Sequence, residues 1–408
     1  MNNFLTVIYY ERMNFVFISP NFPKIYSHFV KALSDNGVTV LGIGDTPKNE
    51  INDELKQYLA EYCYVSDLGN IQWMKNTLDY LENKYGEISY IESNNEYWLF
   101  QDSLLREYKN VKNGFKPKEM DKIKFKSSMK EYFSKAGIKI ARYTLSEDFE
   151  EIKKFANQVG FPLFAKPNNG VGANDTYTIK DENELKLFLN NKPNEQYIIE
   201  EYVNGEIVTF DGIVDDESNP LLSYTETFPI PVAKVVNEDI DDYYYANVDM
   251  DESFRKMGEN VVKAFGIKKR CFHIEFFKLL EDKKGLAKKN EIIGLEVNMR
   301  SPGGDTPELL SIALNDSYYE CYADIIVNNK INKDLNKKHF IAISVSRKNR
   351  FNYIHSNEEI FEKYQDFILK HGYYDKAISL CMGDEYFMAK FDNVDDALSF
   401  KNYVREKN

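Results

Sequence analysis

Cysteine is scarce in this sequence, and no two cysteines are spaced as a C-x-x-C pair. We therefore do not expect a structural zinc site. We expect a cytoplasmic protein whose cysteines are reduced. The sequence also lacks a run of about 20 apolar residues, so no conventional membrane-spanning helix is expected. Its short apolar opening, FLTVIYY, lacks a basic lead and does not resemble a signal peptide. The cysteines are Cys63, Cys271, Cys321 and Cys381.

Positive charge is also in deficit. The 408 residues include 52 Lys and Arg against 65 Asp and Glu, a net charge of −13. This balance argues against nucleic-acid backbones and anionic membrane surfaces as main partners. Hydrophobic residues make up 43% of the chain, enough for globular cores. At roughly 150 residues per domain, the length predicts two or three domains.

The first part of the sequence has no glycine fingerprint of a dinucleotide-binding fold. Residues 14–19 and 38–43 instead have the pattern of short apolar strands, and residues 24–36 between them have helical spacing. A strand, a helix and a strand at these lengths indicate a parallel sheet. We therefore predict a small α/β domain here. Met13 lies just before the first strand and is an alternative start to Met1.

A second informative stretch, FPLFAKPNNGVGANDTYTI, covers residues 161–179. An expected strand delivers Lys166, and a glycine-containing loop then leads into another strand. Glycines let backbone N–H groups approach phosphate oxygens closely, and a lysine adds positive charge. The order differs from a Walker-A loop, which opens a helix. The pattern indicates a phosphate site of another kind, although a glycine hairpin beside a surface lysine would have the same sequence.

Three further segments have weaker signals. Residues 196–214 form an expected strand, turn and strand, whose Glu200 and Glu201 suit an adenine amino group and a ribose diol. Residues 121–136 form an expected basic helix, whose lysines we interpret mostly as a solvated face. Residues 228–250 are irregular and aromatic, which fits either a substrate lid or a plain surface excursion.

The strongest pattern is a pair of strands joined by a charged hairpin turn at residues 281–290. Alternation places His273 and Glu275 on one face of the first strand, and Glu296, Asn298 and Arg300 on one face of the second. Paired carboxylates with an amide oxygen suit one or two Mg²⁺ ions that also hold phosphates. Buried acids without a cation would repel each other. The alternative is a polar strand edge followed by an ordinary Pro-Gly-Gly turn.

In order and spacing, residues 14–328 resemble the ATP-grasp superfamily of ligases. The resemblance rests on Lys166 with its glycine loop, on I-I-E-E-Y-V-N-G-E, on H-I-E and on E-V-N-M-R-S-P-G-G. It implies an α/β and α+β fold with an N-terminal Rossmann-like domain. The implied divisions are residues 13–112 for that domain, 113–195 for the small ATP-grasp subdomain, 196–330 for the large subdomain with the metal site, and 331–408 for a C-terminal α+β subdomain.

The resemblance also implies roles for individual residues. Arg300 and Lys166 would be catalytic, with Arg300 steadying the transferred phosphoryl group. The metal ligands would be Glu275, Glu296 and Asn298, holding two Mg²⁺ ions with Mn²⁺ as a substitute. The implied ATP-binding residues are Lys126, Lys166, Asn169, Gly170, Val171, Gly172, Ala173, Glu200, Glu201, Val203 and Glu206. The implied substrate-binding residues are His273, Arg300, Ser301, Gly303 and Gly304.

The identity of the first phosphate lysine has two candidates. Lys122 follows an aspartate, as the family lysine often does, whereas Lys126 has the usual spacing before Gly137. We favour Lys126 on spacing.

The function implied by the resemblance is that of an ATP-dependent carboxylate–amine ligase, closest in motif to the amino-acid and dipeptide ligase branch. Small-molecule carboxylates and amines would be its partners, with no nucleic acid and no membrane. A homodimer through the N-terminal domain or the tail is compatible with the sequence. The alternatives are a phosphotransferase on the same fold and a non-catalytic ATP-binding protein.

Overall fold

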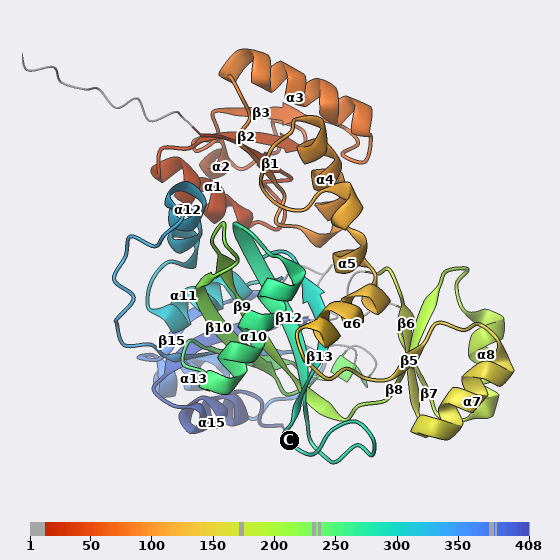
Figure 1. Ribbon diagram of the computed structural model, residues 1–408. Coiled ribbons are helices and arrows are strands. Elements are labelled where there is room, and N and C mark those ends of the chain that lie inside the picture. Colours follow the sequence, from red (N-terminus) through yellow and green to blue (C-terminus); the bar gives the residue numbers. More distant parts are fainter. Residues whose placement is uncertain are drawn as a thin grey trace, which may run out of the picture. The chain divides into compact units, whose positions relative to one another are not determined.

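The computed structural model of the chain describes residues 13–170, 175–230, 234–235, 238–374, 379 and 382–407. Two compact units make up the chain (Figure 1). Unit 1 is Met1–Pro117 with Tyr319–Ile331, and unit 2 is Lys118–Tyr318 with Asn332–Asn408. Within the described ranges, no helix has both the length and the apolar character needed to cross a membrane.

Unit 1 contains the predicted parallel sheet, with strand order β3-β2-β1-β4. Its central strand β1 is buried at every position, as expected for a strand covered on both faces. The strands are β1 (Asn14–Ile18), β2 (Thr39–Gly44), β3 (Glu61–Tyr64) and β4 (Tyr90–Glu92). The helices are α1 (Tyr26–Asp35), α2 (Asp53–Lys56), α3 (Ile71–Tyr85), η1 (Glu96–Trp98), α4 (Leu99–Tyr108) and, from much later in the sequence, α12 (Tyr318–Asn328).

Helix α12 belongs to unit 1 because its aromatic side chains pack on α1. The ring of Phe29 meets the rings of Tyr319 and Tyr322 edge-on, at centroid distances of 4.8 and 5.0 Å. All three side chains are buried. Unit 1 therefore contains a segment that follows most of unit 2 in the sequence.

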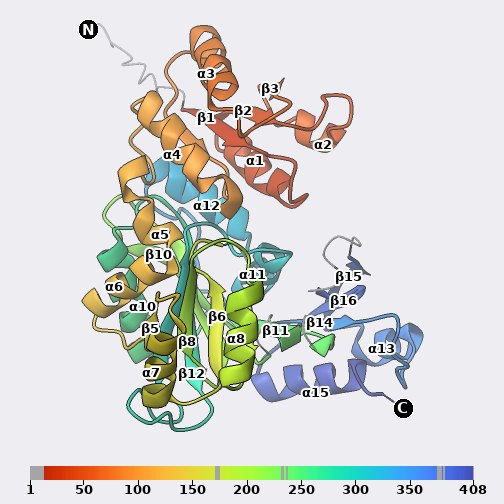
Figure 2. The same cartoon turned by 90° about the vertical axis from the view of Figure 1, so that its right-hand side faces the viewer.

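Unit 2 contains a small four-stranded sheet of order β5-β8-β6-β7, in which the neighbouring strands are antiparallel. Helices α7 and α8 cover one face of this sheet (Figures 1 and 2), and apolar side chains such as Ile152, Leu163 and Phe188 form the core between them. The elements are β5 (Tyr143–Thr144), α7 (Phe149–Val159), β6 (Leu163–Pro167), β7 (Tyr177–Ile179), α8 (Glu182–Asn191) and β8 (Tyr197–Glu201).

A large antiparallel sheet of order β13-β12-β9-β10-β11-β14-β16-β15 forms the rest of unit 2. The tail strands β14, β15 and β16 extend this sheet beyond β11 and do not form a sheet of their own (Figure 2). The strands are β9 (Gly205–Val214), β10 (Pro220–Phe228), β11 (Tyr243–Asn247), β12 (Arg270–Leu279), β13 (Ile292–Asn298), β14 (Ile341–Arg347), β15 (Ile368–Tyr373) and β16 (Glu385–Phe391). The helices are α10 (Glu252–Phe265), α11 (Thr306–Leu314), α13 (Asn357–Tyr364) and α15 (Val394–Val404).

Residues 121–136 were expected to form one basic helix. This prediction is wrong, because the segment forms two helices. A short 3₁₀ turn, η2 (Pro117–Glu119), precedes α5 (Asp121–Lys124) and α6 (Lys126–Lys135). Phe125 between the two helices is extended, with φ −94° and ψ 120°. The backbone N–H of Lys126 consequently bonds to the carbonyl of Asn168, at 2.8 Å. The break places Lys126 in the first turn of α6, beside the loop that follows β6.

Candidate functional site

The predicted hairpin of β12 and β13 brings its polar residues together. In the antiparallel register, Glu275 lies opposite Glu296, and His273 lies opposite Asn298. The amide nitrogen of Asn298 donates to Oε1 of Glu275 at 3.4 Å. A register shift next to Glu275 accommodates one extra residue, Leu295, in β13. Two carboxylates and an amide oxygen thus share one patch of the sheet.

This group of oxygens fits a hard divalent cation. Both carboxylates remain partly exposed, at 25% for the side chain of Glu275 and 15% for that of Glu296. Burial alone would raise the pKa of Glu275, but His273, Arg300 and Lys166 lower it below its ordinary value. Carboxylate and amide oxygens are the ligand chemistry that Mg²⁺ prefers. The residues present therefore fit the ion that the sequence predicts.

Lysines from two elements meet next to these oxygens. Lys126 of α6 donates to the carbonyl of Gly170 at 3.0 Å, and its Nζ lies 3.4 Å from Oε2 of Glu296. Lys166 of β6 pairs with Oε2 of Glu200 at 2.9 Å. Both lysines are almost fully buried. Lys122, the other candidate, pairs with Glu119 at 3.4 Å. The structure thus brings Lys126 to the predicted metal ligands.

Lys130 is a site residue that sequence reasoning missed. It was expected on a solvated face, but it is buried and forms an ion pair with Oε1 of Glu200. Burial alone would raise the pKa of Glu200, but Lys130 and Lys166 lower it to about 2. The available signal was spacing, because Lys130 follows Lys126 by one helical turn and shares its face.

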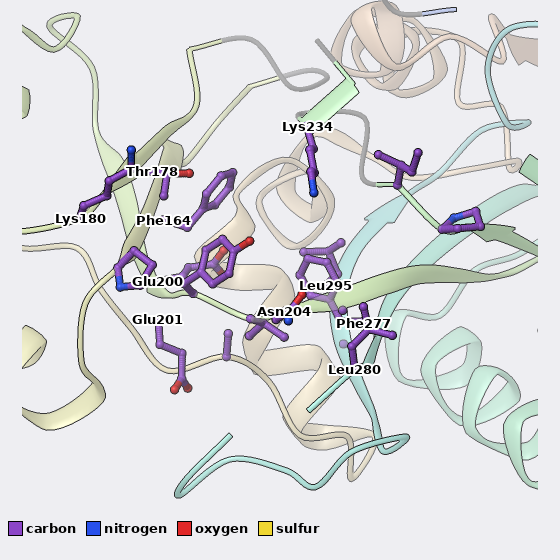
Figure 3. A pocket seen from close by; sticks show the side chains of 18 of the residues that line it. Phe164, Thr178, Lys180, Glu200, Glu201, Asn204, Lys234, Phe277, Leu280 and Leu295 are labelled. Atoms are coloured by element: carbon purple, nitrogen blue, oxygen red, sulfur yellow. The ribbon is translucent and has the colours of Figure 1, made fainter. Parts of the chain in front are cut away.

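A cavity of about 680 Å³ lies between the small and the large sheet of unit 2. Figure 3 shows Phe164 on one side and Leu295 and Phe277 on another. This volume falls in the range of small-molecule sites, roughly 300–1,000 Å³. Pro229, Ile230, Lys234 and Glu238 also line the cavity, so described parts of the segment expected as a lid face it.

The predicted adenine hinge borders this cavity, with Glu200, Glu201 and Val203 among its lining residues. The carboxylate of Glu201 is already bound: it accepts from the backbone N–H of Arg142 at 2.8 Å and from Nε of Arg142 at 2.9 Å. The backbone of the hinge is therefore the part that can meet a ligand. Glu206, expected at a ribose, pairs with Lys278 at 3.1 Å and is not among the cavity's lining residues.

The glycine loop is only partly described. Asn169 is exposed and Gly170 is half-buried. Val171, Gly172 and Ala173, which were predicted to cover the phosphates, lie outside the described residues.

The turn after β13 is fixed by internal hydrogen bonds. Nη1 of Arg300 donates to the carbonyl of Ser301 at 2.9 Å. Ser301 is fully buried, and its hydroxyl lies 3.4 Å from the hydroxyl of Tyr318. Gly303 is exposed and Gly304 is half-buried. Of the residues predicted to bind substrate, the two glycines therefore present their backbone, whereas the side chain of Ser301 faces the interior.

His273, also predicted to bind substrate, is held at both ring nitrogens. Nδ1 lies 2.7 Å from Oδ1 of Asp211, and Nε2 lies 3.2 Å from Oε1 of Glu275. Burial alone would lower the pKa of His273, but these two carboxylates raise it to about 10. Asp211, on β9, is a second residue that the sequence analysis missed. The available signal was alternation along the strand, which places Asp211 on the same face as Thr209.

Comparisons with known proteins bear on the fold. No model of a known protein family matches the chain. Formate-dependent phosphoribosylglycinamide formyltransferase of Prochlorococcus marinus is 34% identical over 79 residues, a match spanning 18% of this chain and only 20% of that protein. Among solved structures, L-amino acid ligase from Bacillus licheniformis has a TM-score of 0.70 at 11% identity, covering 96% of this chain and 97% of the other.

A second solved structure, the biotin carboxylase domain of Hydrogenobacter thermophilus 2-oxoglutarate carboxylase in complex with MgADP and bicarbonate, has a TM-score of 0.63 at 14% identity. The likeness covers 92% of this chain and 86% of that one. At such identities the comparisons establish the fold alone. The predicted ATP-grasp fold is confirmed.

Proposed function

We propose that this chain, which has the ATP-grasp fold, is an ATP-dependent carboxylate–amine ligase that forms an amide bond through an acyl phosphate. One observation carries the proposal: buried Lys126 lies 3.4 Å from Glu296, buried Lys166 interacts electrostatically with Glu296 and Glu275, and Glu275, Glu296 and Asn298 lie together on neighbouring strands of unit 2. Lysines suit a polyphosphate, and carboxylates suit Mg²⁺. The likeness to an L-amino acid ligase supports an amino acid or a similar small carboxylate as substrate.

In this proposal the cavity receives the nucleoside. Adenine lies between Phe164 and Leu295, and the backbone of Glu201 and Val203 provides its hydrogen-bond partners. Lys126 and Lys166 hold the phosphates, together with the backbone of the loop at Asn169–Ala173. Glu206 binds the ribose hydroxyls, for which it exchanges its ion pair with Lys278.

The proposed metal ligands are Glu275, Glu296 and Asn298, which would hold two Mg²⁺ ions, with Mn²⁺ as a substitute. When bound, the ions neutralise the polyphosphate and the leaving group. The likeness to a structure that contains MgADP supports this cofactor.

The reaction then has two steps. A carboxylate oxygen of the substrate attacks the γ-phosphorus of ATP in line, the bond to the β–γ bridging oxygen breaks, and ADP leaves. An amine nitrogen next attacks the carbonyl carbon of the acyl phosphate, phosphate leaves with the bonding electrons, and the amine loses its proton to water. Lys166 stabilises the charge of the α- and β-phosphates, and Arg300 stabilises the transferred phosphoryl group and the tetrahedral oxyanion.

On the substrate side, we assign carboxylate binding to the guanidinium of Arg300 and to the backbone of Gly303 and Gly304. His273 on β12 and Ser301 in the turn after β13 act as buried supports more than as direct contacts. A cytoplasmic location and a homodimer stay predictions from the sequence.

The test measures release of ADP and phosphate with Mg-ATP against a panel of single and paired amino acids, with Glu296→Gln as control. We expect one pair to stimulate turnover in the wild type only, with a coupled product of matching mass. Stable phosphorylated product without free phosphate would identify a phosphotransferase instead. Nucleotide binding without turnover on any acid would identify a binding protein.

A further inference from the structure

Two acids lie behind the predicted metal ligands, deeper in the large sheet. Asp211 on β9 and Glu226 on β10 are both fully buried. Strands β10, β9, β12 and β13 are consecutive neighbours in the sheet. In their registers Asp211 lies opposite His273, and Thr209 lies opposite Glu275. Since alternate residues share a face, these polar side chains line up across one face toward Glu275.

A continuous set of hydrogen bonds follows this line. Oδ2 of Asp211 accepts from the hydroxyl of Thr209, and Oδ1 pairs with Nδ1 of His273 at 2.7 Å. Nε2 of the same ring reaches Oε1 of Glu275 at 3.2 Å. Bonds at opposite nitrogens fix the plane and the rotation of the imidazole. Asp211 therefore determines where His273 points, and His273 determines where Oε1 of Glu275 lies.

We propose that Asp211 is a positioning residue for the metal ligand Glu275 and that it acts through His273. The inference rests on the proposed function, since it requires Glu275 to bind an ion. His273 and Asn298 both contact Oε1 of Glu275 and so hold the carboxylate in one orientation. A carboxylate held in this way loses less conformational freedom when the ion binds. Outer partners of metal ligands typically contribute about 10–100-fold to metal affinity.

Glu226 provides a matched control. It is as buried as Asp211, and within the part of the chain that the structure describes no hydrogen bond joins its carboxylate to His273 or Glu275. Its carboxylate still lies close to the set: one ligand atom each from Glu226, Asp211 and His273 fall within 4.8 Å of one another. Both changes replace a buried acid with its amide in the same surroundings, and they differ in that burial and Asp211 raise the pKa of Glu226 well above its ordinary value. Only Asp211, however, has a hydrogen bond to His273.

The experiment measures Mn²⁺ binding to the full chain by electron paramagnetic resonance, in the presence of a non-hydrolysable ATP analogue. Asp211→Asn replaces a charge-assisted hydrogen bond with a weaker neutral one. We expect it to weaken Mn²⁺ binding by about tenfold or more, with the metal-free affinity for the analogue unchanged. Glu226→Gln should bind Mn²⁺ like the wild type. If Asp211→Asn does not fold, His273→Gln breaks the same link and must cause the same loss.

A double variant separates positioning from other roles. In a Glu275→Gln background the ligand that Asp211 positions is already damaged, so adding Asp211→Asn should cause no further loss. An equal loss in both backgrounds would overturn the proposal. So would an equal loss in Glu226→Gln, because it would make Asp211, Glu226 and His273 an ion site of their own.

The same measurement distinguishes this inference from the proposed function. If Glu275→Gln weakens Mn²⁺ binding and Asp211→Asn leaves it unchanged, only the positioning role fails. If the wild type does not bind Mn²⁺ with the analogue, or if Glu275→Gln has no effect, the metal site fails and the inference fails with it.

Discussion

Glu200 is held between two buried lysines, one oxygen for each, and this sharing decides how Lys166 can act. Lys130 takes Oε1 and Lys166 takes Oε2. Burial lowers the pKa of Lys130, which shows the cost of keeping this charge away from water. Lys130 thus limits how strongly Glu200 holds Lys166, the lysine that we propose binds phosphate.

The first prediction concerns Lys130→Met. The carboxylate of Glu200 stays buried but loses one of its two charged partners, so we expect a loss of about 1–3 kcal/mol in unfolding free energy. Because Glu200 then depends on Lys166 alone, we also expect about tenfold weaker binding of an ATP analogue, or about 1.4 kcal/mol. Urea unfolding and calorimetric titration check the two effects. Lys135→Met, at an exposed position of the same helix, is the control and should change neither.

The second prediction is a pH dependence at Asp242. Burial raises the pKa of Asp242 to about 7. A folded-state pKa above the unfolded one means that folding binds a proton, so this contribution is complete below the unfolded pKa of about 4 and is lost as the pH rises to about 7. Asp242→Asn keeps the acceptor for the backbone N–H of Tyr243 and removes the titration. Between about pH 4 and 7 we therefore expect the variant to gain stability relative to the wild type, by up to about 1.4 kcal/mol for each pH unit.

Urea unfolding at several pH values measures this gain. Asp392→Asn, at an exposed carboxylate paired with Lys338, is the matched control and should follow the wild type. Parallel curves for Asp242→Asn and the wild type would show that the carboxyl is not perturbed.

At the scale of elements, helix α6 packs closely against β13 at Gly294. The ring of Phe133 packs over Gly294, where an added Cβ would lie 2.5 Å from Cδ1 of the ring. The ring is confined by Phe265 and Phe276, with centroids 5.8 Å away in each case. Because α6 carries Lys126 and Lys130, this contact sets the position of those lysines relative to the proposed metal ligands.

The third prediction is therefore that Gly294→Ala displaces α6. Overpacking of this kind costs about 1–3 kcal/mol, and we expect weaker binding of the ATP analogue along with lower stability. Phe133→Leu should partly restore both in the double variant, because a smaller side chain makes room for the new methyl group. Denaturant unfolding and calorimetric titration of the three variants give the coupling. Simple addition of the two losses would show that the contact does not seat the helix.

The elements near the site were predictable where the signal is local. The hairpin of β12 and β13 follows from alternation and a charged turn, so the pairing of Glu275 with Glu296 could be predicted. The break at Phe125 could not, because an extended residue between two basic stretches leaves the helical pattern intact. The burial of Lys130 and of Asp211 could not be predicted either, because it depends on which other elements pack against α6 and β9.

At the scale of the whole molecule, contacts between segments that are far apart in the sequence could not be predicted, because they too depend on tertiary packing. Helix α12 packs on α1 although it lies much later in the sequence, and β14 pairs with β11. The apolar patterns of these segments predict that they are buried but do not identify what covers them. The order of the ATP-grasp motifs was predictable, because each motif is short and its spacing is visible in the sequence.

Every residue assigned to the proposed ATP site belongs to unit 2, whereas both tryptophans, Trp73 and Trp98, belong to unit 1. Tryptophan fluorescence therefore reports unit 1, and far-UV circular dichroism is dominated by the larger unit 2. A ligand stabilises the folded unit that binds it, by about 2.7 kcal/mol at 100 times its dissociation constant. We expect Mg²⁺ with a saturating ATP analogue to raise the urea midpoint seen by circular dichroism and leave the fluorescence midpoint unchanged. Lys166→Met should abolish the shift. An equal rise in both signals would mean that the two units unfold as one cooperative body, with the binding energy shared across the molecule.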